Sequence, residues 1–488
     1  MKPFKILLFI ASAIAMLTLI AIVFPKDGLR VAGMELHFPT VEKIIVPKEE
    51  LDLQAFLEQQ ALRDAENQRI LQGLQDTVDF YRRRMEEGEL RFWFPQDDAD
   101  FVMPFFDLLA TAESEGRTVR ILHYGDSQLE MDRLTNRLRA YMQQTFGGGG
   151  PGMLNFQPVI RSLSVVHSAS GSLDHRAPYG ETERNDGHYG PLMNVHILDG
   201  EATARFSATS SRGADSALMR FSSFKLLLNN HGDSLSCTAT ARGIHNATQT
   251  CSRHGVQCLS WHTDSAVPLF TLTVTGHADL YGMMVDNGPG VAVDNIPMRG
   301  CSGQQFTMVN AAELAEAYSK MDVALIILQF GGNSVPYIKG EKALATYAAS
   351  IGKQIDRVRQ TCPQAQVLFI GPSDMSTTVN GEYVTYPYLP NIVDGLRDSV
   401  LAHGAAFWSL YDAMGGKNSM PVWVDKGLAG PDYIHYSQKG ADIMGDRIAR
   451  AFSIAYDYYL VRKRQDEQRA AIEADTLSAA SITNTQHQ

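Results

Sequence analysis

The run of residues 322–330 constrains the fold more than any other stretch, because apolar side chains follow one another there almost without interruption. A strand with one solvated face alternates apolar and polar residues, whereas an uninterrupted run predicts a strand buried on both faces. Strands of this kind belong to parallel sheets that are covered by helices on each side. The run therefore predicts an α/β domain with a parallel sheet.

Other parts of the chain repeat this character in alternation with helical periodicity. The predicted strands are 119–124, 367–370 and 405–410, and the predicted helices cover about 340–361, 389–403 and 438–461. The alternation begins near residue 119, stops at the glycine cluster that ends at Gly152, and resumes after about residue 290. We therefore expect one α/β domain in two parts, formed by residues 96–154 and 291–462.

Residues 155–290 differ in composition, being rich in Ser, Thr, His and Gly, with short alternating runs and no helical periodicity. This pattern predicts an inserted β-sandwich, which we interpret as a unit of the carbohydrate-binding type. Tyr179, Tyr189 and Trp261 are candidates to stack on sugar rings, and packing in a core is the other interpretation of the same residues.

Residues 6–24 are apolar except for Ser12 and Thr18. A helix of this length crosses a bilayer core of roughly 30 Å at about 1.5 Å per residue. A cleavable signal peptide is the alternative, but no small-residue cleavage pattern follows Phe24. We expect residues 1–26 to be a cytoplasmic tip and an uncleaved transmembrane anchor, with the rest of the chain exported.

Two further segments flank the α/β domain. Residues 27–95 are predicted to be a linker and a helical stalk, since apolar residues keep helical spacing over about 49–84. Whether this helix packs on the main domain or forms a dimerising coiled coil stays open, because the apolar stripe is short and irregular. Residues 463–488 are polar and are predicted to be a flexible tail.

Composition excludes some functions and leaves others open. The formal net charge of −11 argues against a large phosphate-binding surface, and so against nucleic acid as a main partner. The five cysteines show no metal-binding spacing. We expect one disulfide among Cys237, Cys251 and Cys258 in an oxidising compartment, and the sequence leaves the pair open.

Four short motifs carry residues suited to acyl transfer, which needs a nucleophile, a base, a group that orients the base, and oxyanion donors. Ser127 follows the first predicted strand, at the sheet edge where open α/β sheets bind ligands. Gly303 lies in a turn of the type that lets backbone N–H groups approach a ligand. Asn333 follows the buried strand directly. Asp432 and His435, three residues apart, can face one pocket, where the carboxylate orients the imidazole.

In order and strand context these motifs resemble the SGNH/GDSL hydrolase superfamily, whose markers match Ser127 in GDSQ, Gly303 in CSGQ, Asn333 in GGN, and Asp432 with His435 in DYIH. The resemblance implies a three-layer α/β/α, flavodoxin-like domain. It also implies that Ser127 is the nucleophile, His435 the base and Asp432 its orienter. The oxyanion donors would be Ser127, Gly303 and Asn333. Gly300 is a rival for the oxyanion glycine, and Asp374 is a rival acid.

The insertion and the anchor together resemble those of peptidoglycan O-acetylesterases. This resemblance implies a hydrolase without metal or cofactor that removes acetyl groups from an envelope polysaccharide, in the periplasm, at a bacterial inner membrane. Two alternatives stay open: an O-acetyltransferase that uses the same triad, and a non-catalytic glycan-binding envelope protein. Protein partners, the acyl group and the glycan are not specified by the sequence.

Overall fold

The computed structural model describes residues 3–25, 28–31, 34–36, 38, 53–163, 165–180, 186–208, 220–232 and 234–485, with side chains left out at some positions within these ranges. The chain forms two compact units, Met1–Gly73 and Leu74–Gln488. The glycan-stacking, triad and oxyanion candidates all lie in the second unit.

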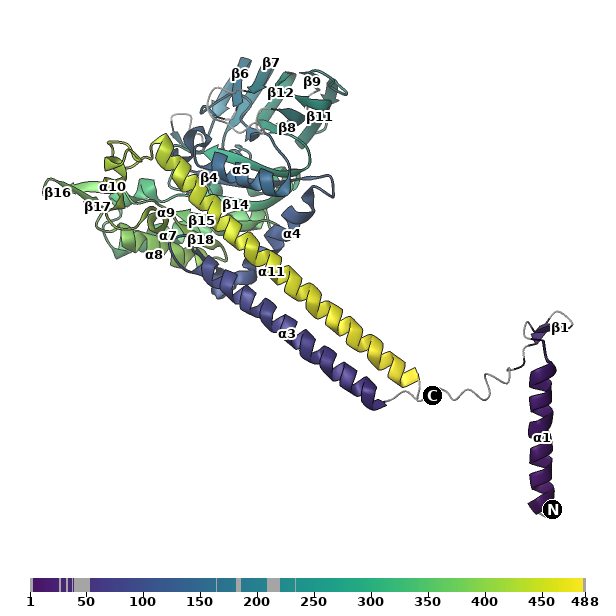
Figure 1. Ribbon diagram of the computed structural model, residues 1–488. Coiled ribbons are helices and arrows are strands. Elements are labelled where there is room, and N and C mark those ends of the chain that lie inside the picture. Colours follow the sequence, from purple (N-terminus) through teal and green to yellow (C-terminus); the bar gives the residue numbers. More distant parts are fainter. Residues whose placement is uncertain are drawn as a thin grey trace. The chain divides into compact units, whose positions relative to one another are not determined.

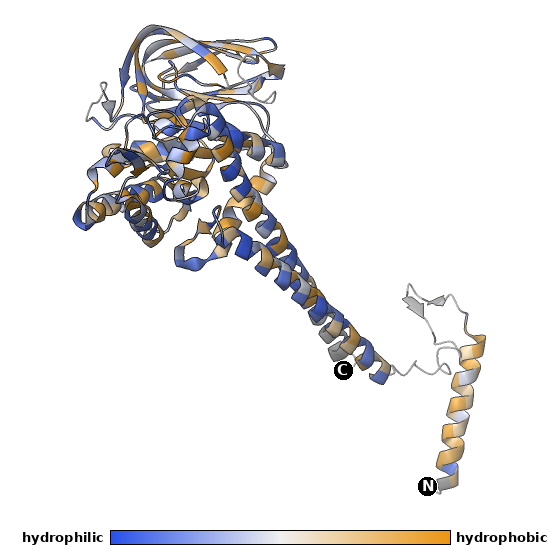
Figure 2. Cartoon of the chain, turned by 60° about the vertical axis from the view of Figure 1, so that its left-hand side comes forward, coloured by the Kyte–Doolittle hydropathy of each residue, from blue (hydrophilic) through white to orange (hydrophobic). Residues whose placement is uncertain are grey.

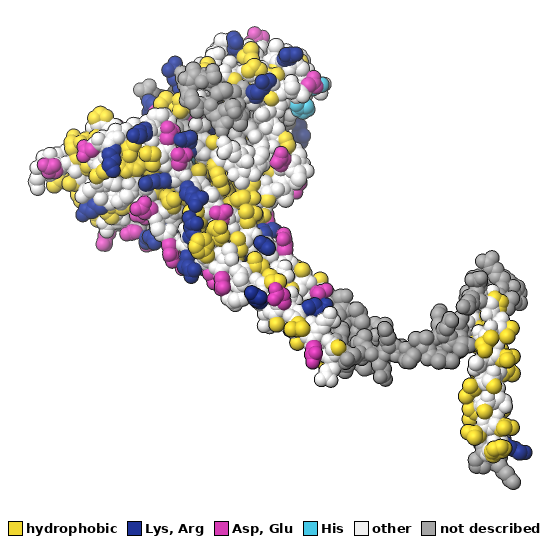
Figure 3. Space-filling model, viewed as in Figure 1, with side chains coloured by type: hydrophobic (Ala, Val, Ile, Leu, Met, Phe, Trp, Pro, Cys, Tyr) yellow, Lys and Arg dark blue, Asp and Glu magenta, His cyan; other side chains and the backbone are white. Residues whose placement is uncertain are grey.

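The first unit contains a helix with the properties of a membrane span. Helix α1 (Pro3–Val23) includes the apolar stretch Phe4–Val23, of which 6% is buried. Its hydrophobic side chains are exposed around the helix (Figures 2 and 3). Length and composition suit a span, and a signal sequence has the same properties. The other elements of this unit are β1 (Leu29–Val31), β2 (Met34–Leu36) and the first turns of α3 (Leu53–Glu86).

The second unit is built on a six-stranded sheet with the order β13-β4-β14-β15-β18-β3. The strands are β3 (Phe92–Trp93), β4 (Thr118–Gly125), β13 (Gly290–Pro297), β14 (Val323–Gln329), β15 (Gln366–Gly371) and β18 (Ala406–Ser409). All pairs are parallel except β18 with the edge strand β3. Numbered along the chain, the five parallel strands have the flavodoxin-like order 2-1-3-4-5, in which ligands bind where the order reverses, between β4 and β14.

Helices cover both faces of this sheet, as the sequence predicts. One face packs on α4 (Met103–Ala112), α5 (Thr135–Phe146) and α11 (Gln438–Thr485), and the other on α6 (Ala311–Ser319), α7 (Glu341–Thr361) and α8 (Leu389–Ala402) (Figure 1). Alternate residues of β14 enter opposite cores: Ile326 and Leu328 pack on one side, and Ile327 on the other. The three-layer α/β/α prediction is confirmed.

Shorter elements lie around the carboxyl edge of the sheet. They are the hairpin strands β16 (Ser376–Val379) and β17 (Glu382–Thr385), and the helices α9 (Leu410–Met414) and α10 (Ser419–Asp425). The hairpin packs on the loop that carries His435, because Tyr383 stacks on Tyr433 with ring centroids 3.6 Å apart.

The segment between α5 and β13 is β-rich, as predicted. Its strands are β5 (Gly152–Leu154), β6 (Val165–Arg176), β7 (Val195–Ala208), β8 (Phe221–Asn230), β9 (Leu235–Thr240), β10 (Thr248–Cys251), β11 (Gly255–Val267) and β12 (Leu269–Asp286). They are hydrogen-bonded as one eight-stranded sheet, in which the first half of β12 pairs with β7 and β9 and the second half with β5 and β8. The sheet encloses its own core, where Phe224 stacks on Phe270. We call these strands the β-unit.

The three aromatic residues considered for sugar stacking do not form an exposed surface. Trp261 and Tyr189 are fully buried. Tyr179 is half-buried, and its hydroxyl accepts a hydrogen bond of 2.8 Å from Asn194. Core packing is therefore the correct interpretation of Trp261, which lies on β11, and of Tyr189, which lies in the loop before β7.

Two other predictions are wrong. All five cysteines, each within the described residues, are free thiols. Cys237 pairs in register with Gln249 and Cys251 with Leu235, so these two cysteines are offset along neighbouring strands, and Cys258 lies on β11.

The segment predicted as a flexible tail also differs, since α11 continues to Thr485. Its continuation is held by Arg462, which donates a hydrogen bond of 2.9 Å to Asp100, and by Gln465, which donates one of 2.8 Å to Gln75 in the last turns of α3. The Ala, Glu, Gln and Arg residues that made this segment look like a polar tail are also strong helix formers.

A buried ion cluster joins the β-unit to the parallel sheet. Arg120 on β4 is 1% exposed and donates to Asp286 at the end of β12 (2.7 Å) and to Asp294 on β13 (2.6 Å). Asp294 also accepts the backbone N–H of Met153 on β5. Burial opposes the charged form of Arg120, but the two carboxylates outweigh it and raise the pKa of the guanidinium. The cluster therefore joins β4, β12 and β13 through Arg120, and it joins β5 to them through Asp294.

We expect Arg120→Ala to lower the free energy of unfolding by about 3–5 kcal/mol, because it leaves two carboxylates buried without their cation. Arg137→Ala is the control, since Arg137 pairs with Asp446 at the surface, where such pairs contribute at most about 1 kcal/mol. Guanidinium titration of the full-length proteins in detergent measures both. A loss for Arg120→Ala no larger than that of the control would contradict a structural role for the cluster.

Candidate active site

Ser127 lies where β4 ends at the carboxyl edge of the parallel sheet. Strand β4 ends at Gly125, and the chain turns at Asp126 into the short 3₁₀ helix η3 (Ser127–Asp132). The Asp126 side chain accepts the backbone N–H of Gln128 at 3.0 Å and so caps this turn. A Cβ at Gly125 would meet the Leu129 side chain at 2.7 Å, so a larger residue there would require Leu129 to shift. The turn thus presents the Ser127 hydroxyl at the point where the strand order reverses.

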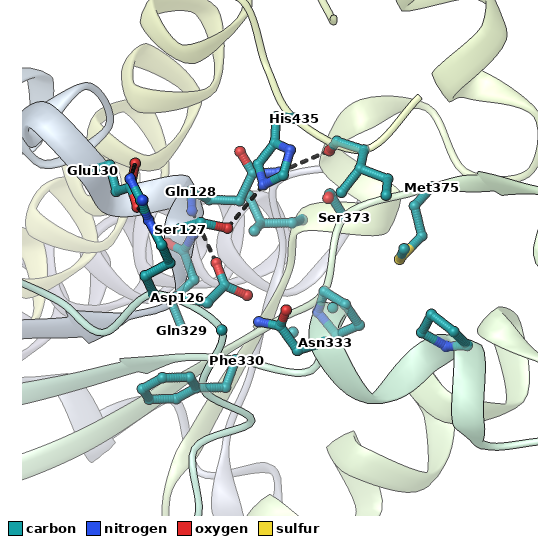
Figure 4. A pocket seen from close by; sticks show the side chains of 18 of the residues that line it. Asp126, Ser127, Gln128, Glu130, Gln329, Phe330, Asn333, Ser373, Met375 and His435 are labelled. Atoms are coloured by element: carbon teal, nitrogen blue, oxygen red, sulfur yellow. Dashed lines mark hydrogen bonds and ion pairs between the residues drawn. The ribbon is translucent and has the colours of Figure 1, made fainter. Parts of the chain in front are cut away.

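Ser127, His435 and Asp432 form one hydrogen-bonded line. The Ser127 Oγ atom lies 2.8 Å from Nε2 of His435 (Figure 4). On the other side of the imidazole, Nδ1 of His435 lies 2.7 Å from Oδ2 of Asp432. The other Asp432 oxygen accepts the backbone N–H groups of Ile434 and His435. Burial opposes ionisation of Asp432, but the hydrogen bonds from His435 and Ile434 outweigh it and lower the pKa of the carboxyl. The structure therefore brings together the three predicted triad residues.

Two residues that the sequence analysis did not single out hold the His435 loop against the Ser127 turn. Gln128 donates from Nε2 to the Ile434 carbonyl at 2.8 Å. Arg133 donates to the carbonyls of Tyr436 (3.1 Å) and Ser127 (2.8 Å). The available sequence signals were a polar residue directly after Ser127 and a cation six residues after it. Neither indicates a role until the distant His435 loop is placed beside them.

Asn333 lies in η7 (Gly332–Tyr337), directly beyond β14, and lines the same cavity as Ser127 and His435 (Figure 4). Its side-chain amide donates one hydrogen bond of 2.9 Å to the Cys301 carbonyl. An amide N has two hydrogens, so one remains for a ligand. Asn333 is thus held by the segment that contains the predicted oxyanion glycine.

The structure places the rival Gly300, and not Gly303, at the cavity. Gly300 lines it, and a Cβ at Gly300 would meet nothing within 4 Å. Gly303 is absent from the lining, and a Cβ there would meet the Phe330 ring at 2.8 Å. Both have φ near +80° (76° and 80°), so sequence alone could not separate a ligand-facing glycine from one that packs under an aromatic ring.

The rival acid Asp374 has a different environment from Asp432. It is buried and accepts hydrogen bonds from the Thr385 hydroxyl (2.7 Å) and the Met420 backbone N–H (2.8 Å). These contacts tie the β16–β17 hairpin to α10. Asp374 is therefore a structural carboxylate, and Asp432 is the one that contacts His435.

The cavity around Ser127 has a volume of about 560 Å³. Met375, Leu410 and Ile434 give it apolar walls, and an ion pair between Arg299 and Glu130 lies at its rim. Within the described part of the chain, no group of three or more His, Cys, Asp or Glu is arranged to hold a metal ion.

Comparison with known proteins agrees with this geometry. Residues 271–443 match the GDSL-like lipase/acylhydrolase family, a range that includes Asn333, Asp432 and His435. A solved peptidoglycan O-acetylesterase covers 75% of this chain and 98% of its own length, with 23% identity and a TM-score of 0.60. The α/β domain thus shares the fold of this esterase, and its second part resembles the GDSL-like acylhydrolase family. Ser127 precedes the matched range, which begins within β12 of the β-unit.

Two carbohydrate esterases of family two also match, less closely. One, from Corynascus thermopiles (Myceliophthora fergusii), carries a carbohydrate-binding domain and has 10% identity over 58% of this chain and 99% of its own, with a TM-score of 0.27. The other, from Cellvibrio japonicus, has 8% identity over 60% and 98%, with a TM-score of 0.24. No curated protein matches the chain.

Gly300 and Gly303 offer a test of their different environments. Gly303→Ala should lower the free energy of unfolding by about 1–3 kcal/mol more than Gly300→Ala, because both accept the same backbone strain but only Gly303→Ala forces a methyl group into Phe330. Chemical denaturation of the two variants measures the difference. Equal losses would mean that Phe330 moves aside freely.

Asp126 makes stability depend on pH. Burial raises the pKa of its carboxyl to about 6 from 3.8, so its stabilising contribution is complete below about pH 4 and is lost as the pH rises through 6. Asp126→Asn keeps the acceptor for Gln128 and cannot ionise. We therefore expect it to stabilise the protein by about 1–3 kcal/mol at pH 8 and much less at pH 4. Melting temperatures of both proteins at the two pH values check this, and an equal difference at both would contradict it.

Proposed function

We propose that this protein is a serine ester hydrolase that removes small acyl groups, chiefly O-acetyl, from a cell-envelope polysaccharide such as peptidoglycan. The observation that carries the proposal is the hydrogen-bonded line from Ser127 through His435 to Asp432, at a cavity that Asn333 also lines. The acylhydrolase family match supports the reaction class. The fold shared with a peptidoglycan O-acetylesterase supports the substrate class.

The geometry suits nucleophilic catalysis in two steps. Ser127 Oγ gives its proton to His435 Nε2 and attacks the ester carbonyl, while Asp432 keeps Nδ1 of His435 as an N–H donor. The resulting oxyanion accepts hydrogen bonds from the backbone N–H groups of Ser127 and Gly300 and from the Asn333 amide. His435 then protonates the departing sugar oxygen, which leaves the acyl group on Ser127. Water, deprotonated by His435, releases the acid and restores the serine.

The exposure of the base favours water as the acceptor over a second sugar. The side chains of His435 and Asp432 are 37% and 48% exposed. Solvent therefore reaches the base directly, whereas a transferase has to keep water from the acyl-enzyme until a sugar hydroxyl arrives.

Helix α1 supports a location at the bacterial inner membrane, with the SGNH domain in the periplasm, where the proposed substrate lies. Its stretch Phe4–Val23 has the length and composition of a single span. Sequencing the mature N-terminus tests this, because a start downstream of Phe24 would replace the anchor with a cleaved signal.

We expect Ser127→Ala to abolish release of acetate from O-acetylated peptidoglycan and from 4-nitrophenyl acetate, because only the hydroxyl attacks. Asn333→Ala should lower kcat by about 10²- to 10³-fold, the usual loss for one oxyanion donor. Acetate and acetylated product are measured together. Acetyl groups appearing on added glycan instead of in free acetate would reassign the enzyme as a transferase.

A matched pair of variants tests the assignment of the acid. Asp432→Asn should lower kcat by about 10⁴-fold, as loss of the orienting carboxylate does in serine hydrolases. Asp374→Asn should instead lower the melting temperature and keep most of the turnover, since Asp374 binds Thr385 and Met420. The reverse pattern would make Asp374 the acid.

A further inference from the structure

A second cavity adjoins the one that contains Ser127. It has a volume of about 1020 Å³ and shares three lining residues with the first cavity: Gly300, Asn333 and Tyr337. It extends from this shared boundary along the start of α7, where Lys339, Lys342 and Thr346 line it. The two cavities thus meet at the proposed oxyanion donors and form one path along the surface. We call the second cavity the groove.

Both walls of the groove are held in place by hydrogen bonds. Tyr347 on α7 donates to the Ser302 carbonyl at 2.7 Å, and Gln304 donates to the Ser350 hydroxyl at 2.6 Å. On the same segment, the Cys301 carbonyl accepts from Asn333. The wall that borders the groove therefore also positions the proposed oxyanion donor, so a ligand in the groove contacts a surface fixed relative to the reacting atoms.

Tyr337 lies at the boundary between the two cavities and is 81% exposed. Its ring is therefore open to a ligand that reaches this boundary. The apolar C–H face of a sugar ring packs well on such a ring, while the tyrosine hydroxyl stays in water. No aromatic among the three considered in the β-unit offers a comparably exposed ring, since two are fully buried and Tyr179 is half-buried.

More cationic than anionic side chains line the groove. Lys339 and Lys342 line it together with one acid, Glu341, and neither lysine forms an ion pair with a carboxylate of the described residues. The lining of the groove therefore carries a net positive charge, although the net charge of the whole protein is −11. The two lysines favour an anionic ligand over a neutral one.

We propose that the groove is a subsite for an anionic glycan strand, in which the sugar next to the acylated one stacks on Tyr337 and a carboxylate attached to the strand binds Lys339 and Lys342. The inference rests on the proposed function and deepens it, because it places recognition of the polymer on the SGNH domain. Peptidoglycan, whose peptide stems carry carboxylates, has this chemistry. Acetylated xylan offers similar sugar rings without the charge.

The test compares kcat/KM of the full-length protein on O-acetylated peptidoglycan, acetylated xylan and 4-nitrophenyl acetate. Tyr337→Ala should lower the ratio of polymer to aryl-ester activity about tenfold on both polymers, whereas Tyr337→Phe, which keeps the ring, should preserve it. The double variant Lys339→Ala/Lys342→Ala should lower activity about tenfold on peptidoglycan alone, with a smaller effect at high salt. Lys353→Ala, an exposed lysine on α7 that lines neither cavity, should change nothing.

Equal losses on polymers and on the aryl ester in Tyr337→Ala would overturn the subsite, and so would equal effects of the lysine variant on peptidoglycan and xylan. Binding separates this outcome from failure of the proposed function. In the Ser127→Ala background, cosedimentation with O-acetylated peptidoglycan should fall when Tyr337→Ala is added and should not fall with Lys353→Ala. If the wild type cleaves no ester, the proposed function fails, and this binding result alone decides whether the groove holds glycan.

Discussion

The arrangement of the second unit depends on the burial of the Arg120 guanidinium between two carboxylates. Removing an ion from water costs several kcal/mol, and the cost is recovered only when every partner is in place with good geometry. Here the partners come from β12 and β13, while Arg120 lies on β4. Any shift of the β-unit relative to the parallel sheet separates these charges, so the cluster favours a single docking of one sheet on the other. Strand β4 is held near its start by Arg120, and Ser127 follows its end.

The active site is also fixed by contacts between segments that lie far apart in the sequence, but these contacts are weaker. His435 comes from a loop far along the chain. The backbone carbonyls on either side of it, those of Ile434 and Tyr436, accept hydrogen bonds from Gln128 and Arg133, which follow Ser127 in the sequence. The distance between Ser127 and His435 is thus set by local contacts between the two turns, and depends little on how the outer helices pack. The β16–β17 hairpin adds a second support, since Tyr383 stacks on Tyr433 within the His435 loop.

The sequence predicts the layers of the fold well because burial on both faces of a strand leaves a strong signal, as in residues 322–330. It also indicates Ser127, Asn333, Asp432 and His435, which follow strands or turns in a recognisable order. The sequence does not predict features that depend on a contact with a residue far along the chain. Gly300 and Gly303 differ in that Phe330 packs against Gly303, and the sequence does not show this contact. The helix beyond Arg462 was mistaken for a tail for the same reason, because Asp100, its partner, lies far back in the sequence.

The place of the β-unit in the chain has a consequence for the order of folding. Strand β4 lies between β13 and β14, and both neighbours follow residue 289 in the sequence. During synthesis β4 therefore waits without a pairing partner while the whole β-unit emerges, and that unit can complete its antiparallel pairs first. Its last strand ends at Asp286 and delivers an anion for Arg120 just before β13 arrives. The insertion thus delays the pairing of β4, which gains β13 on one side first and β14 on the other side later.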